Sequence, residues 1–167
     1  MEIITIREAH KMSSPHPFAL LVSKNIKDVV NVMGVSWWTF ISSKPPKLMV
    51  SIGEKSYTSS NIKKNCEFTL CLPDQDFRRT AWQCGTTSGK IINKIEKYNI
   101  KTMKSKYINV PILTESHVAF ECKIMRSIKF SDHSLFIANI LNIYGDHSKN
   151  HLYANKGYNE LVIFDIV

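Results

Sequence analysis

Two tryptophans stand side by side in a segment of small and apolar residues, Asn31–Phe40. Neighbouring residues on a strand point to opposite faces, so one of Trp37 and Trp38 can fill a core while the other meets a ligand. A flat aromatic ring beside main-chain N–H and C=O groups suits a planar heterocycle with a polar edge. The alternative is that both rings only fill a core and an interface.

A second segment, Ser51–Thr58, leads into an expected helix. It places Lys55, Ser56 and Thr58 around a glycine-containing loop at the helix N-terminus. Hydroxyls, main-chain N–H groups, a positive side chain and the helix dipole together suit a phosphate group. A capped helix with one solvated lysine is the alternative reading.

Two more reactive side chains occur later in the chain, Cys84 and His133. Cys84 ends an expected helix, where the dipole raises a thiol pKa, so a small residue lining a pocket is favoured over a nucleophile. The loop Gly85–Gly89 has the backbone freedom to approach a ligand closely. His133 lies in a predicted hairpin turn, either as a titrating group near a cofactor or as an exposed turn residue.

The elements that carry these side chains are mostly strands. Strands are expected at 18–23, 29–35, 37–41, 48–52, 67–72, 118–124, 135–144 and 161–164, and helices at 58–64, 74–84 and 91–98. The first two strands form a hairpin that the third continues, and the last closes a barrel edge. Thr58 or Ser59 caps the first helix, Asp74 caps the second, and Gly85 ends the second.

Hairpin connections favour antiparallel pairing, so we expect a mainly β protein, a small barrel with a few peripheral helices. The length of 167 residues suits one domain, 1–167. No signal peptide or membrane span is recognised, and the four cysteines show neither Cys-x-x-Cys pairs nor zinc spacing. A cytoplasmic protein with reduced thiols and no metal site is therefore expected. Rossmann, P-loop and nucleophile-elbow motifs are absent from the sequence.

The net charge of +8 fits an acidic partner, either a phosphate-bearing cofactor or a nucleic acid. The alternative is that lysine and asparagine are simply abundant on a solvated surface. Nucleic-acid binding ranks last, because the tryptophan pair is not interleaved with basic residues.

An ordered set of segments resembles the flavin reductase-like family, most closely its flavoredoxin branch. The segments are Pro17–Ser23, Asn31–Thr39, Lys44–Pro46, Ser51–Thr58, Cys84–Gly89, Asp132–Phe136 and Leu152–Tyr153. The resemblance implies an antiparallel Greek-key split β-barrel that binds FMN. It also implies a homodimer with each flavin site near the subunit interface. Gly34 departs from the pattern, since relatives often have threonine there.

The same resemblance assigns cofactor-binding roles. The isoalloxazine and ribityl chain border Asn31, Val35, Ser36, Trp37, Trp38 and Thr39, with Trp37 as a main contact; the phosphate takes Ser51, Lys55, Ser56 and Thr58; Cys84 and Gly85 line the pocket. Lys94 reaches the phosphate end, from its own subunit or its partner. His133 stands near the ring where a hydride donor approaches and is the one candidate catalytic residue.

The implied function is electron transfer through bound FMN. The chain is expected to be either an NAD(P)H:flavin reductase, with NADH or NADPH as donor, or a flavoredoxin-like carrier that is reduced by a redox protein partner. A non-enzymatic flavin- or haem-binding module on the same barrel is the alternative.

Overall fold

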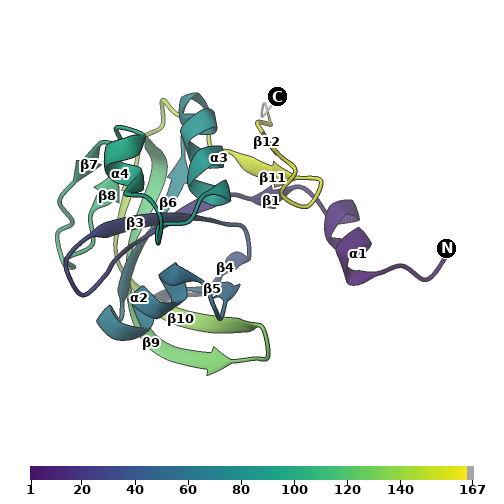
Figure 1. Ribbon diagram of the computed structural model, residues 1–167, viewed down its shortest axis with the longest axis horizontal. Helices are drawn as coiled ribbons and strands as arrows, with labels where there is room; N and C mark the ends of the chain where they lie inside the picture. Colours follow the sequence, from purple (N-terminus) through teal and green to yellow (C-terminus); the bar gives the residue numbers. More distant parts are fainter. Residues whose placement is uncertain (165–167) are drawn as a thin grey trace.

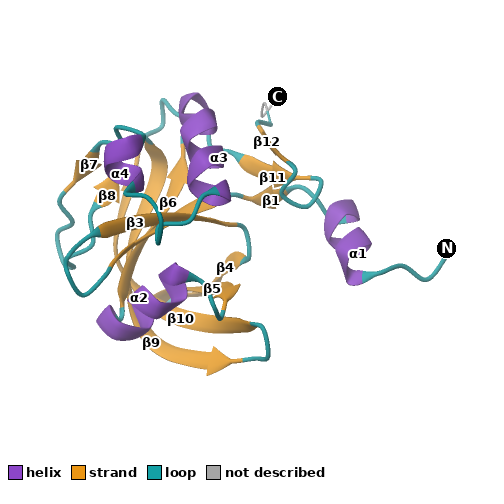
Figure 2. Cartoon of the chain, viewed as in Figure 1, coloured by secondary structure: helices purple, strands orange, loops and turns teal. Residues whose placement is uncertain are grey.

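The protein is described from a computed structural model over residues 1–164. Its helices are α1 (Ile6–Met12), α2 (Tyr57–Asn65), α3 (Arg78–Thr86) and α4 (Lys94–Lys97), with a 3-10 turn η1 (Gln75–Phe77) before α3. Its strands are β1 (His16–Pro17), β2 (Ala19–Lys24), β3 (Val30–Val35), β4 (Trp38–Ser43), β5 (Pro46–Gly53), β6 (Glu67–Pro73), β7 (Thr102–Met103), β8 (Ile112–Leu113), β9 (Ser116–Lys129), β10 (His133–Gly145), β11 (Tyr153–Asn155) and β12 (Glu160–Val162). Strands form the centre of the molecule, and α2, α3 and α4 pack around them (Figures 1 and 2).

The main sheet has seven strands in the order β3-β2-β6-β9-β10-β5-β4, and every pair is antiparallel. Strands β6, β9 and β10 lie next to one another, and β10 pairs on its other side with β5, the strand that precedes β6 in the chain. This is a Greek key. The predicted fold class, an antiparallel Greek-key split barrel with a few peripheral helices, is confirmed.

The barrel is open at one seam. Strands β3 and β4 are the two ends of the sheet order, and only Ser36 and Trp37 separate them along the chain. The Trp37 carbonyl accepts a hydrogen bond from the Ser51 N–H at 2.8 Å, which ties this link to β5. This hydrogen bond holds the backbone of the link in place. Within residues 1–164, the outer edges of β3 and β4 have no strand neighbour in this sheet.

Two apolar clusters explain why the central strands read as continuous apolar runs. On β2, Leu21 enters one cluster with Phe68 and Phe136, whereas Leu20 enters the other with Ala81 of α3. All five residues are at most 1% exposed. A strand that is covered on both faces loses the polar alternation of a half-exposed strand. The second cluster fixes α3 and α4 against the outside of the barrel.

Helix α2 begins one position earlier than predicted. Ser56, not Thr58 or Ser59, is the N-cap, and its Oγ accepts the Ser59 N–H at 3.0 Å. The sequence offered several hydroxyl residues in a row, each able to cap, and packing selects the first because Thr58 and Ser59 are buried.

The second predicted helix is divided into η1 and α3. Asp74 caps it as predicted, with its carboxylate accepting the Gln75 N–H at 2.8 Å. The prediction that Gly85 ends the helix is wrong, because α3 continues through Thr86 and Thr87 is the C-cap. The third predicted helix, 91–98, shortens to α4.

Two strand assignments also change. The segment at 37–41 is a strand, but β4 pairs with β5 instead of extending the β2–β3 hairpin. The tail does not close a barrel edge: β12 pairs with β11, which pairs with β1, in a separate three-stranded sheet. The turn between β11 and β12 contains three successive left-handed residues, Lys156, Gly157 and Tyr158, with φ values of 49°, 63° and 76°.

Glu121 of β9 is fully buried, although its position in the alternating pattern faces away from the barrel interior. Its carboxylate accepts the N–H groups of Lys106 and Tyr107 at 2.8 and 2.7 Å and the Tyr144 hydroxyl at 2.5 Å. Burial raises the pKa of Glu121, but these hydrogen bonds outweigh it, so the pKa lies below its usual value. Glu121 thereby anchors the connection between β7 and β8.

Helix α1 projects from the barrel at the N-terminal end of the chain (Figure 1). It has no buried residue and begins with a capping box in which Thr5 and Glu8 bond reciprocally. Within residues 1–164, no helix combines the length and apolar character that a membrane crossing requires.

Candidate functional site

A hollow of about 260 Å³ opens between β3, the end of β5 and the start of β10, beside the link that joins β3 to β4. Its walls are His10, Met33, Gly34, Val35, Trp37, Ser51, Ile52, Gly53, His133 and Tyr158. The hairpin β9–β10 brings His133 to this place because His133 pairs with Gly53, the last residue of β5. We call this hollow the ring hollow.

Trp37 forms one side of the ring hollow between two histidines. Its ring centroid is 4.9 Å from that of His133 and 4.6 Å from that of His10, the latter edge-on. Trp38 lies on the opposite face, where its indole N–H donates to the Pro17 carbonyl at 3.1 Å and its ring packs near Phe40. The expectation that the two tryptophans take opposite faces is confirmed, and Trp37 alone reaches the hollow.

His133 is the first residue of β10 and not a residue of the turn before it. Its Nδ1 lies 3.0 Å from a carboxylate oxygen of Asp132. Because that carboxylate holds one ring nitrogen, the other nitrogen is left to face a ligand or solvent.

A second hollow, of about 340 Å³, adjoins the first. Its walls are Asn31, Met33, Lys55, Ser56, Tyr57, Gly85, Thr86, Thr87, Ser88, Gly89, Lys90 and Lys94. Met33 borders both hollows. Three lysines and the N-terminus of α2 make this part an anion-binding environment. We call it the phosphate hollow, and the two together the groove.

Gly34 and Gly85 form the floor where the two hollows meet. A Cβ at Gly34 would lie 3.1 Å from the Gly85 Cα and 3.0 Å from the Phe18 ring. The lack of side chains therefore lets α3 approach β3 closely. The threonine that relatives often carry at this position would not fit here without movement of α3.

Asn31 is buried in the wall of the phosphate hollow. Its Nδ2 donates to Thr58 Oγ1 at 2.9 Å, while its Oδ1 has no hydrogen-bond partner within residues 1–164. A Cβ at Gly89 would overlap this Oδ1, so the loop closes over Asn31 only because residue 89 is glycine. An unpaired buried carbonyl oxygen costs stability unless a ligand or water donates to it.

Lys94 is buried as well, at 3% exposure. Its ammonium donates to the carbonyls of Val32 and Cys84, both at 2.6 Å, and so joins β3 to α3. Burial lowers the pKa of Lys94 below its usual value, and Cys84 opposes this shift. An ammonium has three donors, so one remains for the hollow.

Cys84 is fully buried, and burial raises its pKa to about 11, against an opposing effect of Lys94. A thiol in this state is not a nucleophile at neutral pH. The sequence also predicted that Cys84 and Gly85 line the pocket. Gly85 lines the phosphate hollow, whereas Cys84 lies behind it.

The structure thus brings most of the predicted residues together, in two groups. Val35, Trp37, Ser51 and His133 line the ring hollow, and Asn31, Lys55, Ser56, Gly85 and Lys94 line the phosphate hollow. Ser36 is buried at the link between β3 and β4 and lines neither hollow. Trp38 and exposed Thr39 lie on β4 away from the groove, and Thr58 and Cys84 lie behind its walls.

Sequence reasoning missed several residues of the groove. Lys90 belongs to the basic stretch but has no motif, and His10 and Tyr158 come from the two ends of the chain. Burial raises the pKa of Tyr158 to about 12. The backbone at Tyr158 is left-handed, which is rare for a bulky residue. Such strained residues cluster at functional sites, but no local sequence pattern predicts this one.

The chain is a split antiparallel barrel with a groove that is aromatic at one end and cationic at the other, a shape and charge suited to a flat, phosphorylated ligand. The chain belongs to the flavin reductase like domain family, whose family model matches residues 12–162.

Similar proteins agree with this assignment. An uncharacterized protein of Archaeoglobus fulgidus is 36% identical over 121 residues, which cover 72% of this chain and 68% of that protein. Flavoredoxin of Desulfovibrio vulgaris (Miyazaki F) has a TM-score of 0.84 at 22% identity, covering 93% of this chain and 90% of that one. Nitrilotriacetate monooxygenase component B from Bacillus cereus has a TM-score of 0.88 at 19% identity, covering 100% and 97%. At this identity, the two solved structures show the shared split-barrel fold.

Proposed function

We propose that the chain binds FMN in the groove and acts as an oxidoreductase that passes electrons through it. The observation that carries the proposal is that the ring hollow and the phosphate hollow adjoin, with Met33 in the wall of both. Together the two hollows reach the size of a small-molecule site, roughly 300 to 1,000 Å³. One end offers an aromatic wall and the other offers cations, in the order that a flavin mononucleotide requires.

An unpaired polar atom fits the same ligand. Asn31 Oδ1 is buried without a partner within residues 1–164, and Asn31 belongs to the wall of the phosphate hollow. The ribityl chain of FMN carries O–H donors that can satisfy it. Bound FMN supplies the redox chemistry, and the protein supplies binding, orientation and exclusion of water.

Each part of the groove has a role in this proposal. Trp37 lies against the ring, and the His133 imidazole, held by Asp132, borders the place where a donor approaches. Lys55 and Lys90 neutralise the phosphate, and Ser56 and Ser88 offer hydroxyl groups beside it. Lys94 keeps β3 and α3 at a fixed separation and directs its remaining N–H to the hollow.

We further propose two routes for electrons, which differ in the donor. NADH or NADPH reduces the bound flavin directly in the reductase route, and a redox protein does so in the carrier route. Anaerobic titration of the FMN-loaded protein with each nucleotide, followed at the oxidised-flavin band, separates them. Bleaching by a nucleotide supports the reductase route, and a band that neither nucleotide bleaches supports the carrier route.

FMN binding itself is tested by replacing each of the two exposed lysines of the phosphate hollow and titrating the variants with FMN. Lys55→Gln and Lys90→Gln should each weaken FMN binding about tenfold or more, because each removes a charge-assisted contact to phosphate. Lys104→Gln is the matched control, since it removes the same charge from an exposed position outside the groove. FMN affinity that is equal in all three variants and the parent would refute the proposed site.

We also propose that the protein is a homodimer. Phe40 of β4 is 56% exposed, and its ring lies 5.5 Å from that of Phe120, which pairs with Ile143, itself 54% exposed. Phe40 and Ile143 therefore expose apolar surface on the barrel wall beside buried Phe120. A second copy of the chain is the proposed occupant of this patch, because exposed apolar surface favours association.

Light scattering after size-exclusion chromatography tests this proposal. Phe40→Glu and Ile143→Glu should give monomers. Ile26→Glu, at an exposed turn between β2 and β3, should leave the mass unchanged. A monomeric parent protein would overturn the homodimer.

A further inference from the structure

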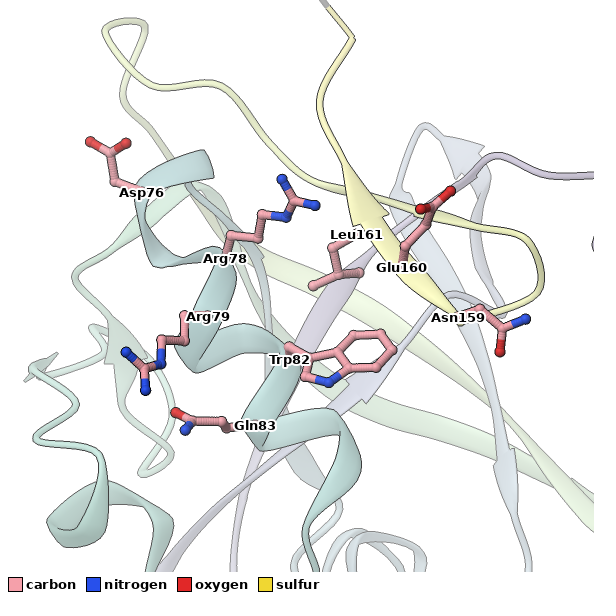
Figure 3. Close-up of a pocket in the computed structure, with 8 residues that line it drawn as sticks. All are labelled: Asp76, Arg78, Arg79, Trp82, Gln83, Asn159, Glu160 and Leu161. Atoms are coloured by element: carbon pink, nitrogen blue, oxygen red, sulfur yellow. The ribbon is translucent and has the colours of Figure 1, made fainter.

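A third hollow, of about 730 Å³, lies between α3 and β12 and shares no lining residue with the groove (Figure 3). Its apolar part consists of Trp82 on α3, whose ring is partly exposed, and Leu161 on β12. Its other lining residues are polar or charged: Asp76, Arg78, Arg79, Gln83, Asn159 and Glu160. An apolar floor inside a polar rim that carries both signs of charge is the composition of a protein interface.

The charges on the rim differ in what they can still bind. Glu160 Oε1 accepts a hydrogen bond from Asn155 at 2.7 Å and lies 3.2 Å from the Lys156 ammonium, so its charge is compensated. Neither arginine forms a salt bridge with any residue in 1–164. Arg78 extends toward β12, whereas Arg79 points away from it (Figure 3). A carboxylate that enters the hollow would therefore gain a charge-assisted hydrogen bond from Arg78.

The N-terminal end of the chain has matching chemistry. Residues 1–5, which we call the arm, precede α1 and include Glu2, Ile3 and Ile4. Ile3 is fully exposed, and Ile4 and Ile6 are exposed as well. Consecutive exposed isoleucines form an apolar surface that calls for a partner, and β-branched residues favour an extended backbone.

The spacing of the arm matches the spacing of the hollow. Arg78 and Trp82 are four residues apart on α3, so they share one face about 6 Å apart along the helix axis. In an extended segment, Glu2 and Ile4 lie on the same side about 7 Å apart. One extended arm can therefore place its carboxylate at Arg78 and its isoleucine on Trp82 at the same time.

The arm of the same chain points away from this hollow. Figure 1 shows the arm beyond α1, on the side of α1 away from α3. The other end of α1 is held at the barrel, because the Gly157 N–H donates to Ser14 Oγ at 3.1 Å and His10 packs on Trp37. The arm is thus presented to another molecule.

We infer that the arm of one copy docks in the third hollow of a second copy, with Ile4 on Trp82 and the Glu2 carboxylate on Arg78. The inference rests on the proposed homodimer and names a contact in addition to the Phe40 patch. In a two-fold dimer each copy gives one arm and receives one, so the contact forms twice.

Docking also links the dimer to the ring hollow. Helix α1 has seven residues, none of them buried, and an isolated helix of this length is marginal in water. A docked arm holds α1 at its N-cap, Thr5, while Ser14 holds the opposite end. His10, which lines the ring hollow, is then kept in place by the second copy.

Disulfide cross-linking between copies tests the docked arm without FMN. Ile4→Cys and Asn159→Cys chains, both with exposed Cys66 replaced by serine, are coexpressed, purified and oxidised. We expect a species of twice the chain mass in the absence of reductant. Ile26→Cys, at an equally exposed isoleucine in the β2–β3 turn, is the matched control in place of Ile4→Cys and should give no such species. Absence of the linked species in the Ile4→Cys mixture would overturn the inference, as would a link within a single chain that carries both cysteines.

Charge reversal tests the polar contact. Arg78→Glu should weaken dimer association about threefold or more, because it turns attraction into repulsion at both arms, and Glu2→Arg in the same chain should restore it. Arg79→Glu makes the same change on a side chain that points away from β12 and should leave association unchanged. Light scattering over a dilution series measures the effect. Equal weakening by Arg78→Glu and Arg79→Glu, or no restoration by Glu2→Arg, would overturn the Glu2–Arg78 contact.

Hydrogen exchange gives a third readout. An Ile3→Asp, Ile4→Asp double variant should raise the exchange rate of the α1 amides several-fold, and unchanged exchange would show that the arm does not hold α1. The levels of the proposal fail separately. A dimeric parent without the disulfide overturns only the docked arm, and a monomeric parent overturns the homodimer as well. Neither result depends on FMN binding in the groove, which direct titration tests.

Discussion

Replacement of Gly34 by alanine tests whether the close approach of β3 and α3 shapes the groove. The new Cβ would lie 3.0 Å from the Phe18 ring and 3.1 Å from the Gly85 Cα. Phe18 is 1% exposed within a packed apolar cluster, and Gly85 is helical backbone. Overpacking of this kind costs about 1 to 3 kcal/mol, and a glycine-to-alanine change recovers about 0.4 to 1 kcal/mol through the unfolded state. We expect Gly34→Ala to lower the free energy of unfolding by about 1 to 2 kcal/mol.

Gly145→Ala is the control, because a Cβ there meets no atom within 4 Å. It should leave stability unchanged or raise it by up to about 1 kcal/mol. Urea unfolding of both variants measures the difference, and FMN titration should show weaker binding only for Gly34→Ala, since its α3 must move. If both variants unfold at the same urea concentration, the close contact between β3 and α3 does not have the importance we assign to it.

Three further tests concern two buried polar side chains and the four thiols. Asn31→Ala should lower the free energy of unfolding by about 1 kcal/mol, because the buried Thr58 hydroxyl loses its hydrogen-bond donor. Urea unfolding measures this difference, and an unchanged midpoint would contradict the prediction. Glu121 has a lowered pKa in the folded state, so its contribution is present above the unfolded value and is lost as the pH falls below about 5. Glu121→Gln should therefore flatten the loss of stability in acid, measured by unfolding between neutral and acid pH, and a parallel loss would refute the assignment. Iodoacetamide should label exposed Cys66 alone among the four thiols of the native protein, as read by mass spectrometry; modification of Cys84 before unfolding would show that the thiol is accessible.

The fold was accessible from the sequence because apolar runs and turn residues mark strands independently of their partners. The run Phe18–Val22 and the alternating residues of β9 identified their strands correctly. The pairing of β4 with β5 was not accessible, since nothing local distinguishes an extension of one hairpin from the start of another. The tail was misplaced for the same reason, as β12 is held by β11 and β1 and not by the barrel.

The site residues that the sequence predicted best are those whose role depends on neighbouring residues in the chain. Trp37, Lys55 and Ser56 lie at the groove as the motifs indicated. Lys94 shows the limit of this reasoning, because only the assembled fold brings the carbonyls of Val32 and Cys84 within 2.6 Å of its ammonium. His10 and Tyr158 are distant in sequence from every motif and reach the groove only through tertiary contacts.

The open seam of the barrel has a consequence for how such a site can change over evolution. The outer edge of β3 has no strand neighbour in the sheet order of the described residues, and its residues Met33 to Val35 line the ring hollow, so main-chain groups there are available to the flavin ring that we propose. Main-chain groups are the same whatever side chain a position carries. In the proposed complex, substitutions at the mouth can therefore alter which molecules reach the ring without removing main-chain hydrogen bonds to it.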